Sequence, residues 1–248
     1  MILIFDFDGT LTPFKLPQYK IFKLAGYTDE RLKDALKKEA LLDNNFYRAF
    51  YVCLEKIYKE REIEFSPESI VDGAENVVFN SGVEEFFDHF GKNKKIKKYV
   101  VTSGIKSYVE QTKIALNLDG IFGVTFDFEK SKFKSIEKLL TDKDKVDAIK
   151  EIQSKNKSNE KIVYFGDGMS DRFAFEYVHS IGGISVLISQ SENKNGFGTV
   201  IDEVFEPDFS KTSKLFKFVD RILKTEKWGA YAISFSWNHR SWKIIFMW

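Results

Sequence analysis

The feature that most constrains this chain is the string ILIFDFDGTLT near its start. Its apolar run ILIF contains β-branched residues and predicts a buried strand of a parallel sheet. Asp6 and Asp8 follow, where this strand is expected to end. Ligands bind at the carboxyl ends of strands in open α/β sheets, and Asp is costly to bury, so the pair indicates a metal site or a reaction centre. The alternative is a cap or turn formed by Asp8, Gly9 and Thr10.

A second string, KIVYFGDGMSDRFA, spans residues 161–174. It predicts another buried strand that ends in a glycine-rich turn, with Asp167 in the turn and Asp171 in the first turn of the next helix. Glycine permits close backbone approach and positive φ angles, which suits a turn that holds a ligand. The alternative is an ordinary capped turn between a strand and a helix.

Hydroxyl residues follow a third apolar run at 99–101. Ser103, between Thr102 and Gly104, is expected at the end of this strand, just before a helix over 106–116. Backbone N–H groups and the dipole at a helix N-terminus favour a phosphate there. We assign the contact to the Ser103 hydroxyl and the Gly104 amide, with Thr102 as the alternative if the register shifts by one residue.

The strings DFDGTLT and GDGMSD, each after an apolar strand, resemble the first and fourth motifs of the haloacid dehalogenase-like (HAD) hydrolases. The resemblance is closest to their phosphoserine phosphatase-like branch, and it matches Ser103 to the second motif. It also implies a lysine, for which Lys145 fits best and Lys143 is the alternative. If Asp144 caps the next helix, Lys145 lies in the first turn, where it opposes the helix dipole unless it faces carboxylates and a phosphate.

The resemblance implies a two-step phosphoryl transfer that depends on Mg²⁺, an ion that prefers oxygen ligands. Asp6 would be the nucleophile, and Asp8 the general acid and then the general base. Lys145, Ser103 and Gly104 would hold the phosphoryl oxygens. The expected oxygen donors around the ion are Asp6, Asp167, the Asp8 carbonyl and, through water or as an orienting residue, Asp171.

We therefore expect an α/β fold, with a Rossmann-like parallel sheet and helices on both faces, formed by residues 1–12 and 81–226. Residues 13–80 predict a small helical cap domain inserted after the first strand. Helical periodicity over 15–24, 29–42 and 46–60 supports that insertion.

The cap carries no motif that identifies the substrate. Its aromatic residues within 46–51 are expected to form the cap core, and Arg31 and Arg48 are candidates for an anion contact, although an exposed helix face is favoured for each. The phosphoserine phosphatase branch has an acidic residue soon after the first motif. This chain has Pro13-Phe14-Lys15 there, which argues against phosphoserine.

Composition narrows the functional classes to which the protein can belong. The chain has 38 Lys+Arg against 37 Asp+Glu, and the net charge of +1 argues against a dedicated nucleic-acid binder. The single cysteine, Cys53, allows no disulfide within the chain and suits a reducing compartment. We expect neither a signal peptide nor a membrane span, so a cytoplasmic enzyme is the default. The oligomeric state is left open.

The predicted function is a Mg²⁺-dependent phosphatase that hydrolyses a small phosphorylated metabolite through an aspartyl-phosphate. The alternatives are a phosphotransferase or phosphomutase with the same intermediate, and a non-catalytic, receiver-like binding module. Asp8 and the insertion at 13–80 argue against the receiver. Residues 227–248 contain all four tryptophans and lie beyond the resemblance. We expect a chain that ends at Glu226 to fold and to keep its activity.

Overall fold

The computed structural model describes residues 1–13, 45–61, 66–68, 77–156, 160–191 and 196–227. Two of the three expected cap helices, over 15–24 and 29–42, lie outside the described residues. Arg31 and the tryptophan-rich tail from residue 228 lie outside them as well.

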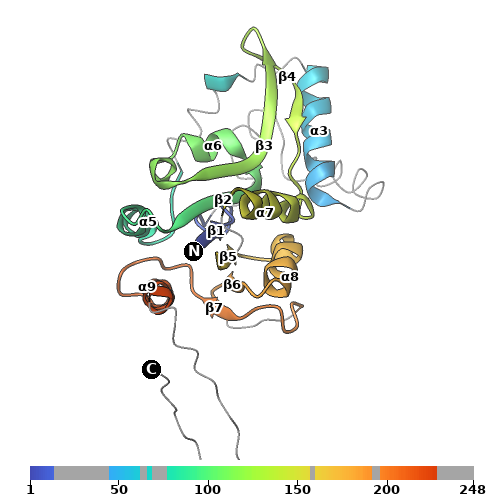
Figure 1. The fold of residues 1–248 in the computed structure, drawn as a ribbon. Coiled ribbons are helices and arrows are strands. Elements are labelled where there is room, and N and C mark those ends of the chain that lie inside the picture. Colours follow the sequence, from blue (N-terminus) through green and yellow to red (C-terminus); the bar gives the residue numbers. More distant parts are fainter. Residues whose placement is uncertain (14–44, 62–65, 69–76, 157–159, 192–195, 228–248) are drawn as a thin grey trace, which may run out of the picture.

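A seven-stranded sheet in the order β4-β3-β2-β1-β5-β6-β7 runs through the described chain (Figure 1). Neighbouring strands are parallel except β3 and β4, which are antiparallel. The first apolar run forms the central strand, and all four of its residues are buried, as its composition predicts. The strands are β1 (Ile2–Phe5), β2 (Lys97–Ile105), β3 (Gly120–Glu129), β4 (Lys132–Lys138), β5 (Ile162–Gly166), β6 (Ile184–Ile188) and β7 (Glu203–Phe205).

Helices cover both faces of the sheet, so the expected α/β class is confirmed. Side chains alternate along β1, so that Ile2 and Ile4 join one hydrophobic cluster and Leu3 and Phe5 join the other. Figure 1 shows α5 and α9 on one side of the sheet, and α7 and α8 on the other. These helices are α5 (Val83–Gly91), α7 (Asp144–Lys155), α8 (Arg172–Ser180) and α9 (Lys214–Lys227).

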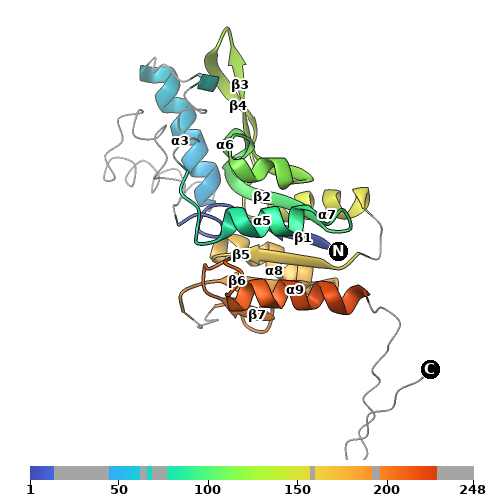
Figure 2. The ribbon, with the colours of Figure 1, turned by 90° about the vertical axis from the view of Figure 1, so that its left-hand side faces the viewer.

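A long hairpin of β3 and β4 extends beyond the rest of the sheet and lies beside α3 (Phe46–Arg61) in both ribbon views (Figures 1 and 2). Tyr58 of α3 packs on Phe133 of β4, with 5.5 Å between the ring centroids. The expectation of a helix over 46–60 is confirmed. The expectation of a helix or loop over 130–140 is wrong, because residues 132–138 form β4. Its Phe133 and Ile136 pair with Phe128 and Phe126 of β3, and the four side chains form an apolar layer against the core cluster that includes Tyr58.

The helix expected over 106–116 is interrupted. It consists of α6 (Lys106–Glu110) and a 3₁₀ turn, η2 (Lys113–Asn117), separated by Thr112 in an extended conformation. The Thr112 hydroxyl donates to the Val109 carbonyl at 2.7 Å. This local hydrogen bond competes with the helical pattern, which explains the break.

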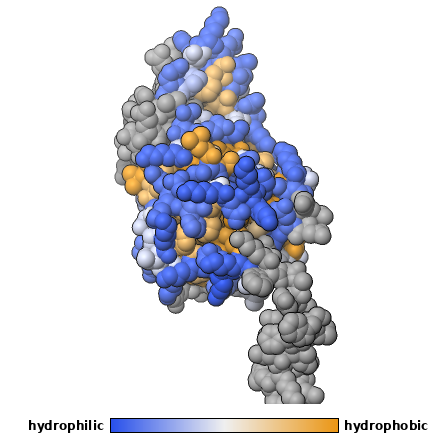
Figure 3. Space-filling model, turned by 60° about the vertical axis from the view of Figure 1, so that its left-hand side comes forward, coloured by the Kyte–Doolittle hydropathy of each residue, from blue (hydrophilic) through white to orange (hydrophobic). Residues whose placement is uncertain are grey.

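Hydrophilic residues cover most of the face drawn in Figure 3, and hydrophobic residues show between them in separate areas. Within the described ranges, no helix combines the length and the apolar character that crossing a bilayer requires.

Candidate active site

The sheet register brings the two acidic strings together. Phe5 pairs with Val100 of β2 on one side and with Phe165 of β5 on the other. The Asp6 amide donates to the Phe165 carbonyl at 2.8 Å, so the chain after β1 continues beside the turn after β5. A cavity of about 310 Å³ opens at these strand ends. Its lining residues are Asp6, Asp8, Phe46, Tyr47, Thr102, Ser103, Gly104, Lys145, Asp167, Gly168, Met169 and Ser170.

Lys145, in the first turn of α7, links the two acidic strings. Its Nζ donates to Asp6 Oδ1 at 2.9 Å and to Asp171 Oδ1 at 2.6 Å. All three side chains are at least 95% buried. Tyr164 of β5 also donates to Asp171 Oδ1, at 2.6 Å. A buried ammonium between two carboxylates has compensated charge and holds both carboxylates in place.

Asp171 holds the turn that follows β5. Its Oδ2 accepts from the backbone amides of Asp167 and Gly168 at 3.1 and 3.4 Å. It ends a 3₁₀ turn, η3 (Met169–Asp171), and directly precedes α8, instead of lying in the first turn of that helix as expected. Because both oxygens of Asp171 accept from the protein, its geometry suits a residue that orients other ligands.

Burial and the neighbouring charges both act on the pKa values of Asp6 and Lys145, partly in opposite directions. Burial raises the pKa of Asp6, and the carboxylates of Asp171 and Asp167 raise it further against the attraction of Lys145. Burial also works against the charge on Lys145, but the carboxylates of Asp171 and Asp6 outweigh it and raise the pKa of this ammonium. Lys145 therefore stays charged, and the carboxylates exceed it in number.

Lys143 and Lys145 have different surroundings. Lys145 is buried against Asp6, whereas the Nζ of Lys143 lies 5.6 Å from the centre of the Phe173 ring. Asp144 is the first residue of α7, and Lys143 takes the cap position. The Asp144 carboxylate accepts from the Thr141 amide and hydroxyl at 2.8 and 2.7 Å. Lys145 still lies in the first turn, as expected.

The strand that carries Ser103 does not end there. β2 continues to Ile105, and its pairing with β3 shifts register between Val101 and Ile105. Within this irregular stretch Thr102 Oγ1 accepts from the Gly104 amide at 2.9 Å. The Ser103 Oγ is buried at the cavity and has no hydrogen-bond partner among the described residues. A buried hydroxyl in that state is suited to a ligand oxygen.

Two glycines allow the acidic residues to come this close. A Cβ on Gly104 would overlap Asp8 Oδ2, and one on Gly9 would overlap the Asp167 carboxylate. Gly9 also has a φ of +87°, which L-residues rarely adopt. The close approach of the first string to β2 and to the turn after β5 therefore requires glycine at positions 9 and 104.

The chemistry of the acidic groups suits a hard cation. Asp6, Asp167 and Asp171 each present an oxygen, and these oxygens lie within 4.8 Å of one another. Carboxylate oxygens are the donors that Mg²⁺ takes in proteins. The excess of carboxylates over Lys145 supplies the negative charge that such an ion needs.

The model of one protein family matches this chain. The family is described as haloacid dehalogenase-like hydrolase, and the match covers residues 3–176. The chain belongs to the haloacid dehalogenase-like hydrolases. A comparison with curated protein sequences finds no match.

Solved structures of HAD hydrolases share the fold. A phosphoserine phosphatase with bound substrate is 22% identical, with 90% of this chain and 97% of that chain covered and a TM-score of 0.62. A phospho-aspartyl intermediate analogue of phosphoserine phosphatase is 20% identical, with 89% and 97% covered and a TM-score of 0.61. The phosphoserine phosphatase from T. onnurineus is 17% identical, with 86% and 95% covered and a TM-score of 0.57.

Helix α3 brings residues to this HAD site that sequence patterns did not assign to it. Phe50 and Tyr51 are buried as expected, but Phe46 is exposed at the cavity, and Tyr47 also lines it. Burial raises the pKa of Tyr47 to about 12, so this phenol stays protonated. Arg48 is exposed and does not line the cavity. Helical periodicity could not distinguish the cavity residues of α3 from its core residues, because the cavity and the core lie on adjoining sides of this helix.

Sequence patterns did not predict two further contacts. Tyr164, which holds Asp171, is one apolar residue among others in a buried strand and carries no local signal. The Tyr51 hydroxyl donates to the Ser103 carbonyl at 2.8 Å, and these residues are 52 positions apart. Only the packing of α3 on β2 creates this contact.

Proposed function

We propose that this HAD hydrolase is a Mg²⁺-dependent phosphatase that hydrolyses a small phosphorylated metabolite through an aspartyl-phosphate on Asp6. The observation that carries the proposal is the shared cavity of Asp6, Lys145 and the Ser103 hydroxyl. It combines a carboxylate nucleophile, a buried cation and a hydroxyl that lacks a partner among the described residues. Such groups together can receive a phosphoryl group.

The metal would be held by the carboxylates of Asp6 and Asp167, with the Asp8 carbonyl as a further donor and Asp171 as the residue that orients them. Bound there, Mg²⁺ would offset the repulsion between a carboxylate and a phosphate dianion. The Lys145 ammonium and the Ser103 hydroxyl would hold phosphoryl oxygens as their charge shifts.

In the first step an Asp6 oxygen attacks phosphorus, and the bond from phosphorus to the leaving oxygen breaks. Asp8 gives its proton to the leaving alcohol. In the second step Asp8 takes a proton from water, whose oxygen attacks phosphorus and releases Asp6 and inorganic phosphate. The half-buried position of Asp8 at the cavity, beside Gly104, is compatible with both proton transfers.

The test is hydrolysis of p-nitrophenyl phosphate with and without Mg²⁺. We expect activity that EDTA abolishes and added Mg²⁺ restores, and a fall of roughly 10⁴-fold or more in kcat for Asp6→Asn. Asp147→Asn is the matched control, because this Asp lies on the exposed side of α7. Full activity in Asp6→Asn or in EDTA would refute the mechanism.

A further inference from the structure

The mouth of the candidate cavity carries two large apolar side chains. Phe46 is 50% exposed and Met169 is 53% exposed, and both line the same cavity as Asp6 and Asp8. A single exposed apolar side chain is ordinary on a protein surface. Two on the rim of one catalytic cavity are informative, because together they present an apolar surface that a ligand can cover.

Neighbouring aromatic rings hold the Phe46 ring in place. The Phe46 ring meets the Tyr47 ring edge-on at 5.7 Å and is roughly parallel to the Phe50 ring at 6.3 Å. Phe50 is buried, so this aromatic group is anchored in the core. The Met169 sulfur lies beside Gly196, where a Cβ would stand 3.6 Å from it. Phe46 is therefore a fixed aromatic wall, and Met169, in the turn after β5, is an adaptable one.

The charged side chains of the cavity come from the strand ends and from α7. Among the described lining residues, the charged side chains are Asp6, Asp8, Lys145 and Asp167. Lys145 is already engaged by two carboxylates, at 2.9 and 2.6 Å. The described rim thus offers apolar contact, whereas an anionic leaving group would face an excess of carboxylates.

We propose that the substrate of this site is a phosphate ester of an apolar alcohol, preferably an aromatic one, whose carbon body packs against Phe46 and Met169. The inference rests on the proposed phosphatase function and adds the class of leaving group to it. The phosphoryl group lies at Lys145 and Ser103. The alcohol extends toward the first turn of α3 and the turn after β5.

The first experiment compares two esters that both release a primary alcohol, 2-phenylethyl phosphate and glycerol 3-phosphate. Their leaving oxygens are alike, so kcat/KM chiefly reports the contact with the carbon body. We expect kcat/KM to be at least about tenfold higher for 2-phenylethyl phosphate. In Phe46→Ala and in Met169→Ala this ratio should fall about threefold to tenfold, while Phe46→Leu should keep most of it.

Leu116→Ala is the matched control, because Leu116 is 95% exposed and does not line the cavity. It should leave the ratio unchanged. An equal ratio in Phe46→Ala and in the unmodified chain would overturn the inference. So would a preference for glycerol 3-phosphate in the unmodified chain.

Calorimetry with Asp6→Asn and Mg²⁺ separates this inference from the proposed function. Binding of 2-phenylethyl phosphate should have a clearly negative heat-capacity change, because apolar surface is buried. Adding Phe46→Ala should reduce that change. If p-nitrophenyl phosphate is not hydrolysed, the phosphatase proposal fails, whereas an equal heat-capacity change for both esters overturns the apolar site.

Discussion

Asp6 and Asp8 are separated by one residue, yet their surroundings differ. Asp6 is 3% exposed and paired with Lys145, whereas Asp8 is half-buried beside Gly104. Both residues follow β1, which ends at Phe5, so the chain can turn between the two side chains. Two carboxylates in unlike settings can divide nucleophilic and proton-transfer roles between them.

Replacing Asp8 tests that division at the level of single residues. Asp8→Asn should slow hydrolysis of the phosphoenzyme by about 10²-fold or more, because no base then activates water. Its formation from p-nitrophenyl phosphate should fall much less, since a good leaving group needs little protonation. Rapid-quench measurement separates the two steps. Equal loss in both would assign Asp8 a different role.

Ser103 gives a second prediction at this scale. Because its buried hydroxyl has no partner among the described residues, Ser103→Ala should remove a contact to the phosphoryl group while leaving no protein group unsatisfied. We expect kcat/KM to fall about 10²-fold and competitive inhibition by inorganic phosphate to weaken. Ser154→Ala, on the exposed side of α7, is the control. Unchanged inhibition by phosphate would favour Thr102 as the contact.

At the scale of elements, α3 is fastened to the phosphate end of the cavity. The Tyr51 side chain is fully buried and donates to the carbonyl of Ser103, a residue that lines the cavity. The hairpin of β3 and β4 supports the same helix through Phe126 and Phe133. The helix that carries Phe46 is thus linked to the residue that we propose binds phosphate.

Tyr51→Phe should therefore affect catalysis as well as stability. The free energy of unfolding should fall by about 1 kcal/mol, the typical net value of one hydrogen bond. We also expect kcat/KM to fall several-fold as Ser103 loses its fixed position. Tyr177→Phe removes a comparable hydrogen bond, to Gln153 at 2.9 Å, away from the cavity. The same loss of stability with unchanged kinetics in both variants would show that Tyr51 is only structural.

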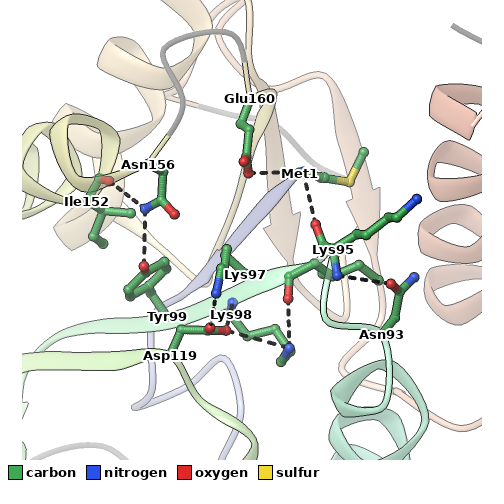
Figure 4. Close-up of polar contacts among 11 residues, drawn as sticks. Met1, Asn93, Lys95, Lys97, Lys98, Tyr99, Asp119, Ile152, Asn156 and Glu160 are labelled. Carbon is green, nitrogen blue, oxygen red and sulfur yellow. Dashed lines mark hydrogen bonds and ion pairs between the residues drawn. The ribbon is translucent and has the colours of Figure 1, made fainter.

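At the scale of the whole molecule, the amino ends of the strands form a polar edge opposite the cavity (Figure 4). Asp119, just before β3, accepts from Lys97 Nζ at 2.8 Å and from the Lys98 amide at 2.9 Å. Asn156, at the end of α7, donates to the Tyr99 hydroxyl at 3.1 Å. These contacts fasten β2, β3 and α7 at the end of the sheet that carries no candidate chemistry.

Asp119 gives a prediction about stability against pH. Partial burial alone would raise the pKa of Asp119, but the hydrogen bonds from Lys97 and Lys98 outweigh it and hold the pKa below its ordinary value. A carboxyl with a lowered folded-state pKa stabilises the fold above about pH 4 and loses this contribution as the pH falls through the folded pKa.

Asp119→Asn should therefore lower the free energy of unfolding by roughly 1 kcal/mol at neutral pH, after allowance for solvent screening. The difference should shrink as the pH falls below about 4. Urea unfolding at several pH values measures it, with Asp220→Asn on the surface of α9 as the control. A difference that persists at the lowest pH would assign the effect to packing instead of charge.

The sequence by itself determined the α/β class and the strands β1 and β5, because buried parallel strands are continuous apolar runs. The family followed from the resemblance of DFDGTLT and GDGMSD to HAD motifs. The sequence also placed Asp6, Asp8 and Asp167 at one edge, since the carboxyl ends of parallel strands meet there. These are local patterns that need no knowledge of distant contacts.

The tertiary structure decided the rest. It showed that Lys145, and not Lys143, lies against the carboxylates. It also showed that the buried Ser103 hydroxyl has no partner among the described residues, while Thr102 accepts from the Gly104 amide. It also made a strand of residues 132–138 and turned Phe46 toward the cavity. Each of these outcomes depends on strand register and side-chain direction. Contacts between residues far apart in the chain fix both, and short sequence patterns do not contain them.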